Sequence, residues 1–271
     1  MSNRPISILL GAVFGFAASG LAFAADLEVK APAPAPVPVY TWTGFYVGLN
    51  AGGHWDHNSI SAAPDPVGFE AEGVDPAILS TIIGTGASVH PDGFIGGGQI
   101  GYNWQTSFLV FGVEADAQGL TGQASPIVTP LTSAGSAPGD FVSNSARPEF
   151  LATFRGRIGV APFGGPNSAL FYATGGGVWG TVKVTDTFGA LGGTSISSAT
   201  ATENRTGWTA GGGIEIPLIN NLTFKAEYLY VDLGHFNQTT APIVGLPATD
   251  ITFAHHYTEN IVRAGLNYQF H

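Results

Sequence analysis

The sequence predicts an all-β protein, an eight-stranded antiparallel up-and-down transmembrane β-barrel with short periplasmic turns and long extracellular loops. From residue 42 onward, apolar and polar residues alternate with a period of two in eight stretches of about ten residues, bounded by Gly, Pro, Asn, Asp or Ser. Only 10% of the 271 residues are charged, against roughly one quarter in a soluble domain. Short and long connections alternate between the stretches, as they do in membrane barrels.

The chain begins with two segments that we expect to lie outside the barrel. Residues 1–24 are predicted to be a cleavable signal peptide, because Arg4 precedes an apolar stretch and Ala22-Phe23-Ala24 supplies the small residues that signal peptidase requires. Residues 25–40 follow as a proline-rich periplasmic linker, since alternating Ala-Pro favours an extended chain. The barrel is expected to occupy residues 41–271.

The strands can be placed from the alternation and from the turn residues between them. The strands are expected near residues 42–53, 94–105, 108–118, 150–161, 169–183, 206–216, 222–233 and 259–270. Short joins follow the second, fourth and sixth strands, as Thr106-Ser107, PFGGPNS and PLINN. Long joins are expected at about 54–93, 119–149, 184–205 and 234–258. A soluble β-sandwich is not expected to alternate short and long connections, whereas a membrane barrel has short turns on its periplasmic side and long loops on its extracellular side.

The two faces of each predicted strand differ in a way that suits lipid outside and a polar lumen inside. Near residues 108–118, Phe111 and Val113 share one face, and Glu114 and Asp116 share the other. Across the strands the second face is rich in glycine, so it cannot form a solvated outer surface, and we expect it to line a narrow lumen. Aromatic residues near the strand ends predict belts at the two bilayer interfaces. They are Trp42, Tyr46, Tyr102, Trp104, Phe108, Tyr172, Tyr268 and Phe270 towards the turns, and Trp55, Phe94, Trp208 and Tyr257 towards the loops.

Charged residues on the lumen face are expected to form an ion-pair network. Charges in a low-dielectric interior are costly unless they are paired, and acids and bases are nearly equal in number here. A hairpin centred on Asn220 sets Glu215 opposite Lys225, and Arg263 points towards Glu227. The alternative is that unpaired charges line a wet pore. The candidate residues are Glu114, Asp116, Arg155, Arg157, Lys183, Glu215, Lys225, Glu227 and Arg263.

The same stretches resemble a known family. An Ala-x-Ala site with a proline-rich spacer, WTGFYVGLNAGG, IGYNWQ, VFGVEADAQG, ATFRGRIGVAP, LFYATGGGVWG and KAEYLYVDLG are similar to the small alphaproteobacterial outer-membrane β-barrel surface proteins, the RopB-type family. The resemblance implies a barrel in the cell outer membrane that supports envelope integrity and meets host cells. It also implies that Tyr268 and Phe270 form the signal read by the outer-membrane insertion machinery. The family usually ends on an aromatic residue, whereas here His271 follows Phe270.

We expect a non-enzymatic protein whose partners are outer-membrane lipid, lipopolysaccharide, the insertion machinery and host or surface ligands. A net charge of −10 argues against nucleic acid as a partner. Gly96, Gly98 and Gly101 match a dinucleotide-binding pattern, but the stretch continues as a strand, so the glycines are expected to make room inside the barrel. Glu114 and Asp116 could act as a general acid and base, although arginine partners favour a structural network.

Histidines and acids in the long joins provide two alternatives, a haem-binding or divalent-metal-binding surface protein and a small porin. Closure of the barrel would make the first, seventh and eighth strands neighbours, so that histidines at their ends could gather at one extracellular rim and bind metal or haem iron. These histidines are His54, His57, His235, His255 and His256. Some relatives in the resembled family are described as haem-binding and some as small porins. The first long join is acidic and could attract divalent cations or cationic partners, or could be a solubilising surface. Its acids are Asp56, Asp65, Glu70, Glu72, Asp75 and Asp92.

Overall fold

The computed structural model describes residues 40–71, 86–122, 127–130, 141–162, 168–190, 195–219, 221–240, 242 and 250–270. The predicted signal peptide, residues 25–39 of the predicted linker, and His271 lie outside the described residues. Among the residues that are described, no helix is long and apolar enough to cross a membrane.

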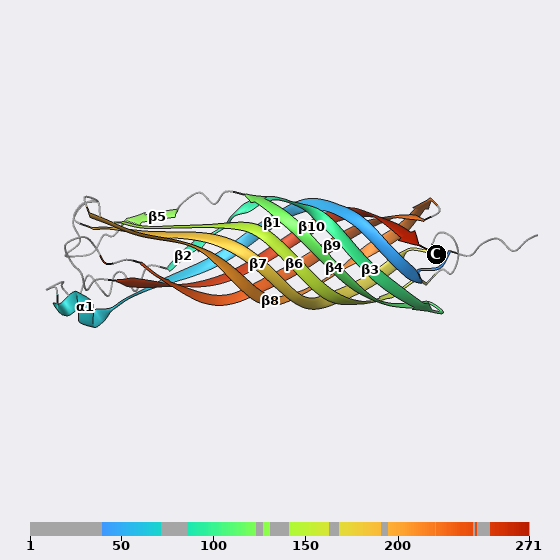
Figure 1. Cartoon of the computed structure of the whole chain (residues 1–271), viewed down its shortest axis with the longest axis horizontal. Helices are drawn as coiled ribbons and strands as arrows, with labels where there is room; N and C mark the ends of the chain where they lie inside the picture. Colours follow the sequence, from blue (N-terminus) through green and yellow to red (C-terminus); the bar gives the residue numbers. More distant parts are fainter. Residues whose placement is uncertain are drawn as a thin grey trace, which may run out of the picture. The chain divides into compact units, whose positions relative to one another are not determined.

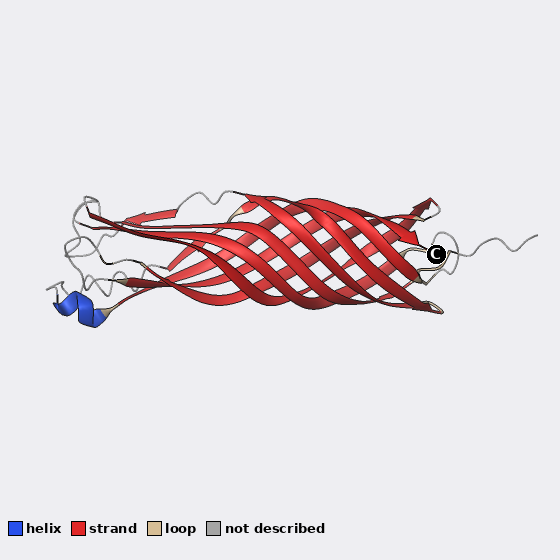
Figure 2. Ribbon diagram, viewed as in Figure 1, coloured by secondary structure: helices blue, strands red, loops and turns tan. Residues whose placement is uncertain are grey.

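Eight long strands form a closed antiparallel up-and-down barrel, which confirms the predicted fold class (Figures 1 and 2). Strands that follow one another along the barrel pair in order, and the last pairs with the first to close the ring. The eight strands are β1 (Gly44–Pro64), β3 (Asp92–Thr106), β4 (Leu109–Gly122), β6 (Phe141–Val160), β7 (Leu170–Ala190), β8 (Ser195–Ile219), β9 (Leu222–Thr239) and β10 (Ile251–Phe270).

The two ends of the barrel carry different connections. At the turn end, where β1 begins and β10 ends, the strands are joined at residues 107–108, 161–169 and 220–221. At the opposite, loop end lie the short helix α1 (Pro66–Ala71) and two short strands, β2 (Gly86–Val89) against β1 and β5 (Ile127–Pro130) against β6 (Figure 1). The predicted alternation of short and long joins is therefore present.

The strands extend further towards the loop end than the sequence indicated. The join expected at 184–205 is instead a long hairpin in which β7 pairs with β8 as far as Ala190 and Ser195. This stretch of β8 is rich in Ser and Thr, so it lacks the apolar face by which strands are recognised. Its threonines nevertheless pair across the strands, as shown by the 3.1 Å separation of the Thr185 and Thr200 hydroxyl oxygens.

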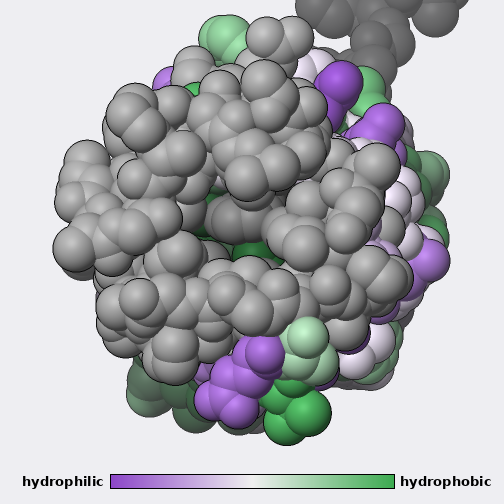
Figure 3. All heavy atoms as spheres, turned by 90° about the vertical axis from the view of Figure 1, so that its left-hand side faces the viewer, coloured by the Kyte–Doolittle hydropathy of each residue, from purple (hydrophilic) through white to green (hydrophobic). Residues whose placement is uncertain are grey.

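The outer wall is apolar, as predicted. Leu49 and Phe154 are 73% and 65% exposed, which suits contact with lipid and not with water. Seen from the loop end, green apolar surface appears around the described part of the wall, interrupted by hydrophilic residues (Figure 3). Exposed aromatic side chains lie towards the turn end, at Trp104, Phe108, Tyr268 and Phe270, and on the loop side, at Trp55, Phe94 and Trp208. Four other predicted belt residues, Trp42, Tyr46, Tyr172 and Tyr257, are instead buried.

Glycines on the lumen face make room for large side chains. At Gly213 a Cβ atom would lie only 2.7 Å from the hydroxyl oxygen of Tyr172. In the stretch GGGQIG, Gly101 is buried on the lumen face, whereas Gly96 and Gly98 lie on the outer face and a Cβ there would meet its nearest atom at 3.7 Å. The expectation of room-making glycines therefore fits Gly101, and it is wrong for Gly96 and Gly98.

Candidate functional site

The lumen is the candidate functional site, because charged side chains from five strands converge inside it. Arg155 of β6 lies at the centre of this network. Its Nη2 atom is 2.5 Å from Oε1 of Glu114 and 2.7 Å from Oδ2 of Asp116, both on β4, and its Nη1 atom is 3.2 Å from Oε1 of Glu227 on β9. The Nε atom donates to the Thr153 hydroxyl at 2.9 Å. One guanidinium therefore binds three carboxylates, two from the neighbouring strand and one from across the barrel.

Other ion pairs also cross the lumen. Glu215 lies opposite Lys225 in the register of β8 and β9, as predicted, but the two side chains do not pair with each other. Lys225 Nζ instead binds both carboxylate oxygens of Glu114 on β4, at 2.8 and 2.9 Å. Glu215 instead accepts from Nη2 of Arg157 at 2.7 Å, while Nη1 of Arg157 donates to the Tyr46 hydroxyl at 2.9 Å. The lumen is narrow enough for these side chains to span it, so the pairs do not follow the strand neighbours alone.

The last strand joins the network through Arg263. Arg263 lies opposite Glu227 of β9, and its Nη2 atom is 2.5 Å from Glu227 Oε2 and 3.0 Å from Asp116 Oδ2. The Tyr172 hydroxyl donates to Glu227 at 2.9 Å. Buried carboxylates and guanidinium groups thus supply one another with charged partners, which is the condition for holding them in a low-dielectric interior.

The prediction for Lys183 is wrong. Val182 and Val184 are buried in the lumen, so the alternation along β7 turns Lys183 to the outer face, where it is exposed. It lies beyond the exposed Trp179 towards the loop end and opposite Arg147 of β6, where water or lipid headgroups can solvate a charge. Without Lys183, the network contains four acids and four bases.

The turn end of the lumen is closed by residues whose role the sequence did not indicate. Trp42, directly before β1, is 1% exposed; its backbone nitrogen donates to Gln105 at 2.7 Å and its carbonyl accepts from Gln269 at 2.7 Å. The Tyr40 hydroxyl donates to Gln269, and its ring lies edge-on to Trp42 with the centroids 5.2 Å apart. The indole packs in an apolar cluster that also includes Val110, Ala161, Leu170 and Tyr172.

Polar and apolar side chains fill the lumen on both sides of the charges. Asn50 donates to Gln99 at 3.0 Å, and Asn267 donates to Glu215 at 2.7 Å, which ties the amide groups near the turn end to the ion pairs. Arg263 is followed towards the loop end of β10 by Ile261, part of a buried apolar cluster. Its other members are Ile95, Leu120, Ala146, Leu151, Val178, Val182, Val184, Leu229, Val231, Leu233, Phe236 and Tyr257.

The five candidate histidines do not gather at one rim, so that expectation is wrong. His54 and His255 are buried in the lumen, whereas His57, His235 and His256 lie on the outer side. The strands continue through these positions, and their alternation sends neighbouring histidines to opposite faces of the wall. His235 and His256 stack with ring centroids 4.1 Å apart.

A bulge in β9 sets the outward direction of His235. Leu233 and Gly234 together oppose Tyr257 of β10, and Gly234 has a φ of 74°, a left-handed conformation that favours glycine. Leu233 and Phe236 consequently both face the lumen, so His235 between them and the bulge turns outward. A strict period of two along β9 would have placed His235 inside.

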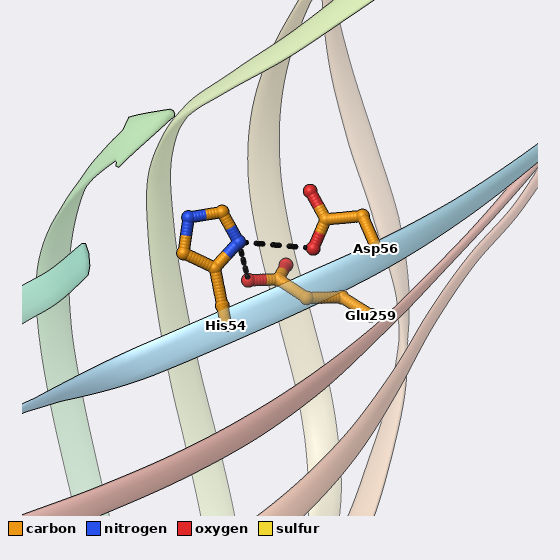
Figure 4. Close-up of side chains that lie close together, drawn as sticks. All are labelled: His54, Asp56 and Glu259. Atoms are coloured by element: carbon orange, nitrogen blue, oxygen red, sulfur yellow. Dashed lines mark hydrogen bonds and ion pairs between the residues drawn. The ribbon is translucent and has the colours of Figure 1, made fainter. Parts of the chain in front are cut away.

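His54 lies beside two acids in a buried cluster that was not predicted as a unit. Its Nδ1 atom is 3.0 Å from Oδ1 of Asp56 and 3.4 Å from Oε1 of Glu259, and the three side chains point towards one another from β1 and β10 (Figure 4). The other ring nitrogen, Nε2, lies 3.1 Å from the Thr121 carbonyl oxygen, and the Tyr257 hydroxyl donates to Oδ2 of Asp56. The sequence placed Asp56 in an acidic loop and Glu259 at a strand end, and only the register of β1 against β10 brings them together.

Comparison with known proteins connects this geometry to a family. The model of the outer membrane protein beta-barrel domain matches residues 12–270. The 31 kDa outer-membrane immunogenic protein of Brucella melitensis biotype 1 is 34% identical, covering 97% of this chain and 99% of the relative. The 22 kDa outer membrane protein of Rhizobium leguminosarum bv. viciae is 31% identical over 68% of this chain and 70% of the relative. Among solved structures, the outer membrane protease OmpT from Escherichia coli has a TM-score of 0.40 at 10% identity, covering 87% of this chain and 99% of that chain.

Proposed function

This chain belongs to the outer membrane protein beta-barrel domain family, and from that premise we propose that it is a non-enzymatic barrel with a closed lumen and a structural role in the envelope. It is a surface protein of the outer membrane. In this role the barrel strengthens the membrane and presents its loop end to the surroundings, and it does not serve as a path for solutes.

The observation that supports a closed lumen is the network of four acids and four bases that spans it. Trp42 at the turn end and the apolar cluster around Leu229 and Val231 fill the lumen on either side of these charges. An eight-stranded barrel has an interior just wide enough for side chains, so a filled interior leaves little room for a hydrated ion.

Conductance separates this function from that of a small porin. Purified protein inserted into a planar bilayer is expected to pass almost no current, and Trp42→Ala combined with Arg155→Ala is expected to increase the current by removing two of the largest side chains in the lumen. A steady open-channel current from the unaltered protein would refute the closed lumen. The envelope role predicts that cells without the protein become more sensitive to detergents, and unchanged sensitivity would count against it.

We further propose lipopolysaccharide as a partner of the outer wall. Arg147 and Lys183 lie directly opposite each other on β6 and β7, both exposed, on the loop side of the Phe150 and Trp179 rings. Two like charges in this arrangement repel each other, and an anionic headgroup at that level would relieve the repulsion. Vesicles containing lipopolysaccharide should stabilise the unaltered protein more than phosphatidylcholine vesicles do. Arg147→Gln with Lys183→Gln should remove that difference, and an undiminished difference would contradict the proposal.

The loop end is proposed to meet host or surface ligands. The β7–β8 hairpin and β1 extend the barrel wall towards this end, and the Brucella relative is named as immunogenic. Cells that lack the protein are expected to adhere less to host cells, with recovery when the gene is restored. Equal adhesion would remove the host-contact part of the proposal and leave the structural part intact.

A further inference from the structure

We propose that His54, Asp56 and Glu259 form a binding site for a divalent transition-metal ion inside the barrel wall. Asp56 on β1 lies directly opposite Glu259 on β10, and His54 is two residues before Asp56 on the same face (Figure 4). One donor atom from each residue lies within 4.8 Å of the others. The site lies at the level of the loop-side belt residue Trp55, at the seam that closes the barrel.

The hydrogen bonds of His54 show which of its two ring nitrogens carries the proton and which is the unprotonated nitrogen that faces the acids. Nε2 is 3.1 Å from the Thr121 carbonyl oxygen, which can only accept, so Nε2 carries the hydrogen. In the neutral imidazole, Nδ1 is then a lone-pair donor directed at Asp56 and Glu259. Three electron-rich atoms therefore converge, and a proton or a cation held between them would stabilise the arrangement.

A second proton on His54 would satisfy only part of the cluster, because Nδ1 lies 3.0 Å from Asp56 but 3.4 Å from Glu259. A proton on Nδ1 is directed at Asp56, 3.0 Å away, whereas neither carboxylate oxygen of Glu259 has a hydrogen-bond partner among the described residues. Glu259 is 0% exposed, so water in bulk does not solvate it either. An imidazolium with two carboxylates also leaves a net charge of −1, while a divalent cation with neutral His54 gives zero. The unpartnered carboxylate points to the metal.

Contacts around the site hold its donors in position. Thr121 fixes the orientation of the His54 ring through Nε2, and the Tyr257 hydroxyl donates to the Asp56 oxygen that does not face His54. Outer contacts of this kind orient the ligands of known metal sites and tune their affinity. The three side chains are held by two paired strands and not by a loop, so little ordering is required on binding.

The donor set indicates the class of metal. One imidazole nitrogen with two carboxylate oxygens suits Zn²⁺ and related transition metals, whereas Ca²⁺ and Mg²⁺ prefer oxygen ligands alone. Three protein ligands leave further coordination positions for water. This site differs from a rim of five histidines, because it uses His54 alone and takes its other two ligands from acids.

Titration of the folded protein with Zn²⁺ tests the site. The protein, prepared without a histidine tag and treated with a chelator, is titrated in detergent in competition with a zinc-binding dye, and Co²⁺ absorption then reports the coordination. We expect one ion per chain. Glu259→Gln preserves the shape of the side chain and removes the charge, so it should weaken binding by at least about tenfold. Asp56→Asn is a second variant with the same expectation, should Glu259→Gln fail to fold.

Asp186→Asn is the matched control. Asp186 is a buried acid paired with a buried histidine, His255, at 3.0 Å, but the His255 ring has Asn58 on its other nitrogen and, within the described part of the chain, no second acid is paired with it. This variant should bind Zn²⁺ within about twofold of the unaltered protein, and unboiled gel mobility checks that every variant is folded. Failure of the unaltered protein to bind one Zn²⁺ would overturn the proposal, as would equal loss of affinity in Asp186→Asn and Glu259→Gln. Neither result bears on whether the lumen conducts.

Discussion

Replacing Arg155 with methionine should show how much the lumen network contributes to the free energy of unfolding. Arg155 binds Glu114, Asp116 and Glu227 at 2.5, 2.7 and 3.2 Å and is 0% exposed. Arg155→Met leaves four acids against three bases in the lumen network. Removing one partner of a buried ion pair costs about 3–5 kcal/mol, and because this guanidinium has three carboxylate partners we expect the upper part of that range. Lys183→Met is the control on the outer wall, expected to change stability by less than about 0.5 kcal/mol.

The free energy of unfolding is measured by urea titration in lipid vesicles, with folded protein followed by gel mobility. Arg155→Met with Glu227→Gln restores three acids against three bases, so the double variant should be more stable than the sum of the two single changes predicts. Strict additivity, or equal stabilities for Arg155→Met and Lys183→Met, would refute the view that balanced charge holds the lumen together.

Two further predictions concern packing and assembly. Gly213→Ala should destabilise the barrel by about 1–3 kcal/mol, because its Cβ would clash with the Ala226 backbone carbonyl oxygen and would lie 2.7 Å from the Tyr172 hydroxyl oxygen. Gly98→Ala on the outer face should be nearly neutral, and similar unfolding midpoints for the two variants would contradict the steric argument. Phe270→Ala should reduce the yield of folded barrel in cells, and deletion of His271 should not. Equal yields in a membrane-fractionation assay would show that the terminal aromatic is not the assembly signal.

The fold could be predicted because lipid outside the barrel imposes one simple rule on the sequence. Leu49 and Phe154 face outward, and the residues directly before and after each of them are small or polar. The same alternation of apolar with small or polar residues is visible along the membrane-spanning part of the strands. The rule weakens beyond the bilayer, where the outer face need not be apolar. There β7 and β8 continue through Thr185 and Thr200, where the sequence pattern predicts a loop.

The members of the lumen network could largely be chosen from the sequence, but their partners could not. Alternation assigns a face, and eight of the nine candidates lie in the network. The pairing of Lys225 with Glu114 and of Arg157 with Glu215 depends on the diameter of the lumen, which no local pattern encodes. Trp42 shows the same limit: an aromatic residue before a strand resembles a belt residue until its hydrogen bonds to Gln105 and Gln269 are known.

Lys183 and Glu259 differ in how they satisfy the need of a buried charge for a partner. The alternation along β7 turns Lys183 outward, and the network that remains inside the barrel has equal numbers of acids and bases. Glu259 breaks this rule, since it is buried opposite another acid, Asp56, with no hydrogen bond to either oxygen among the described residues. The four acids of the lumen network are each paired with a base, whereas this carboxylate gains no stability from such a pair. Its presence is best explained by a cation that it binds, and His54 supplies the nitrogen donor that selects a transition metal.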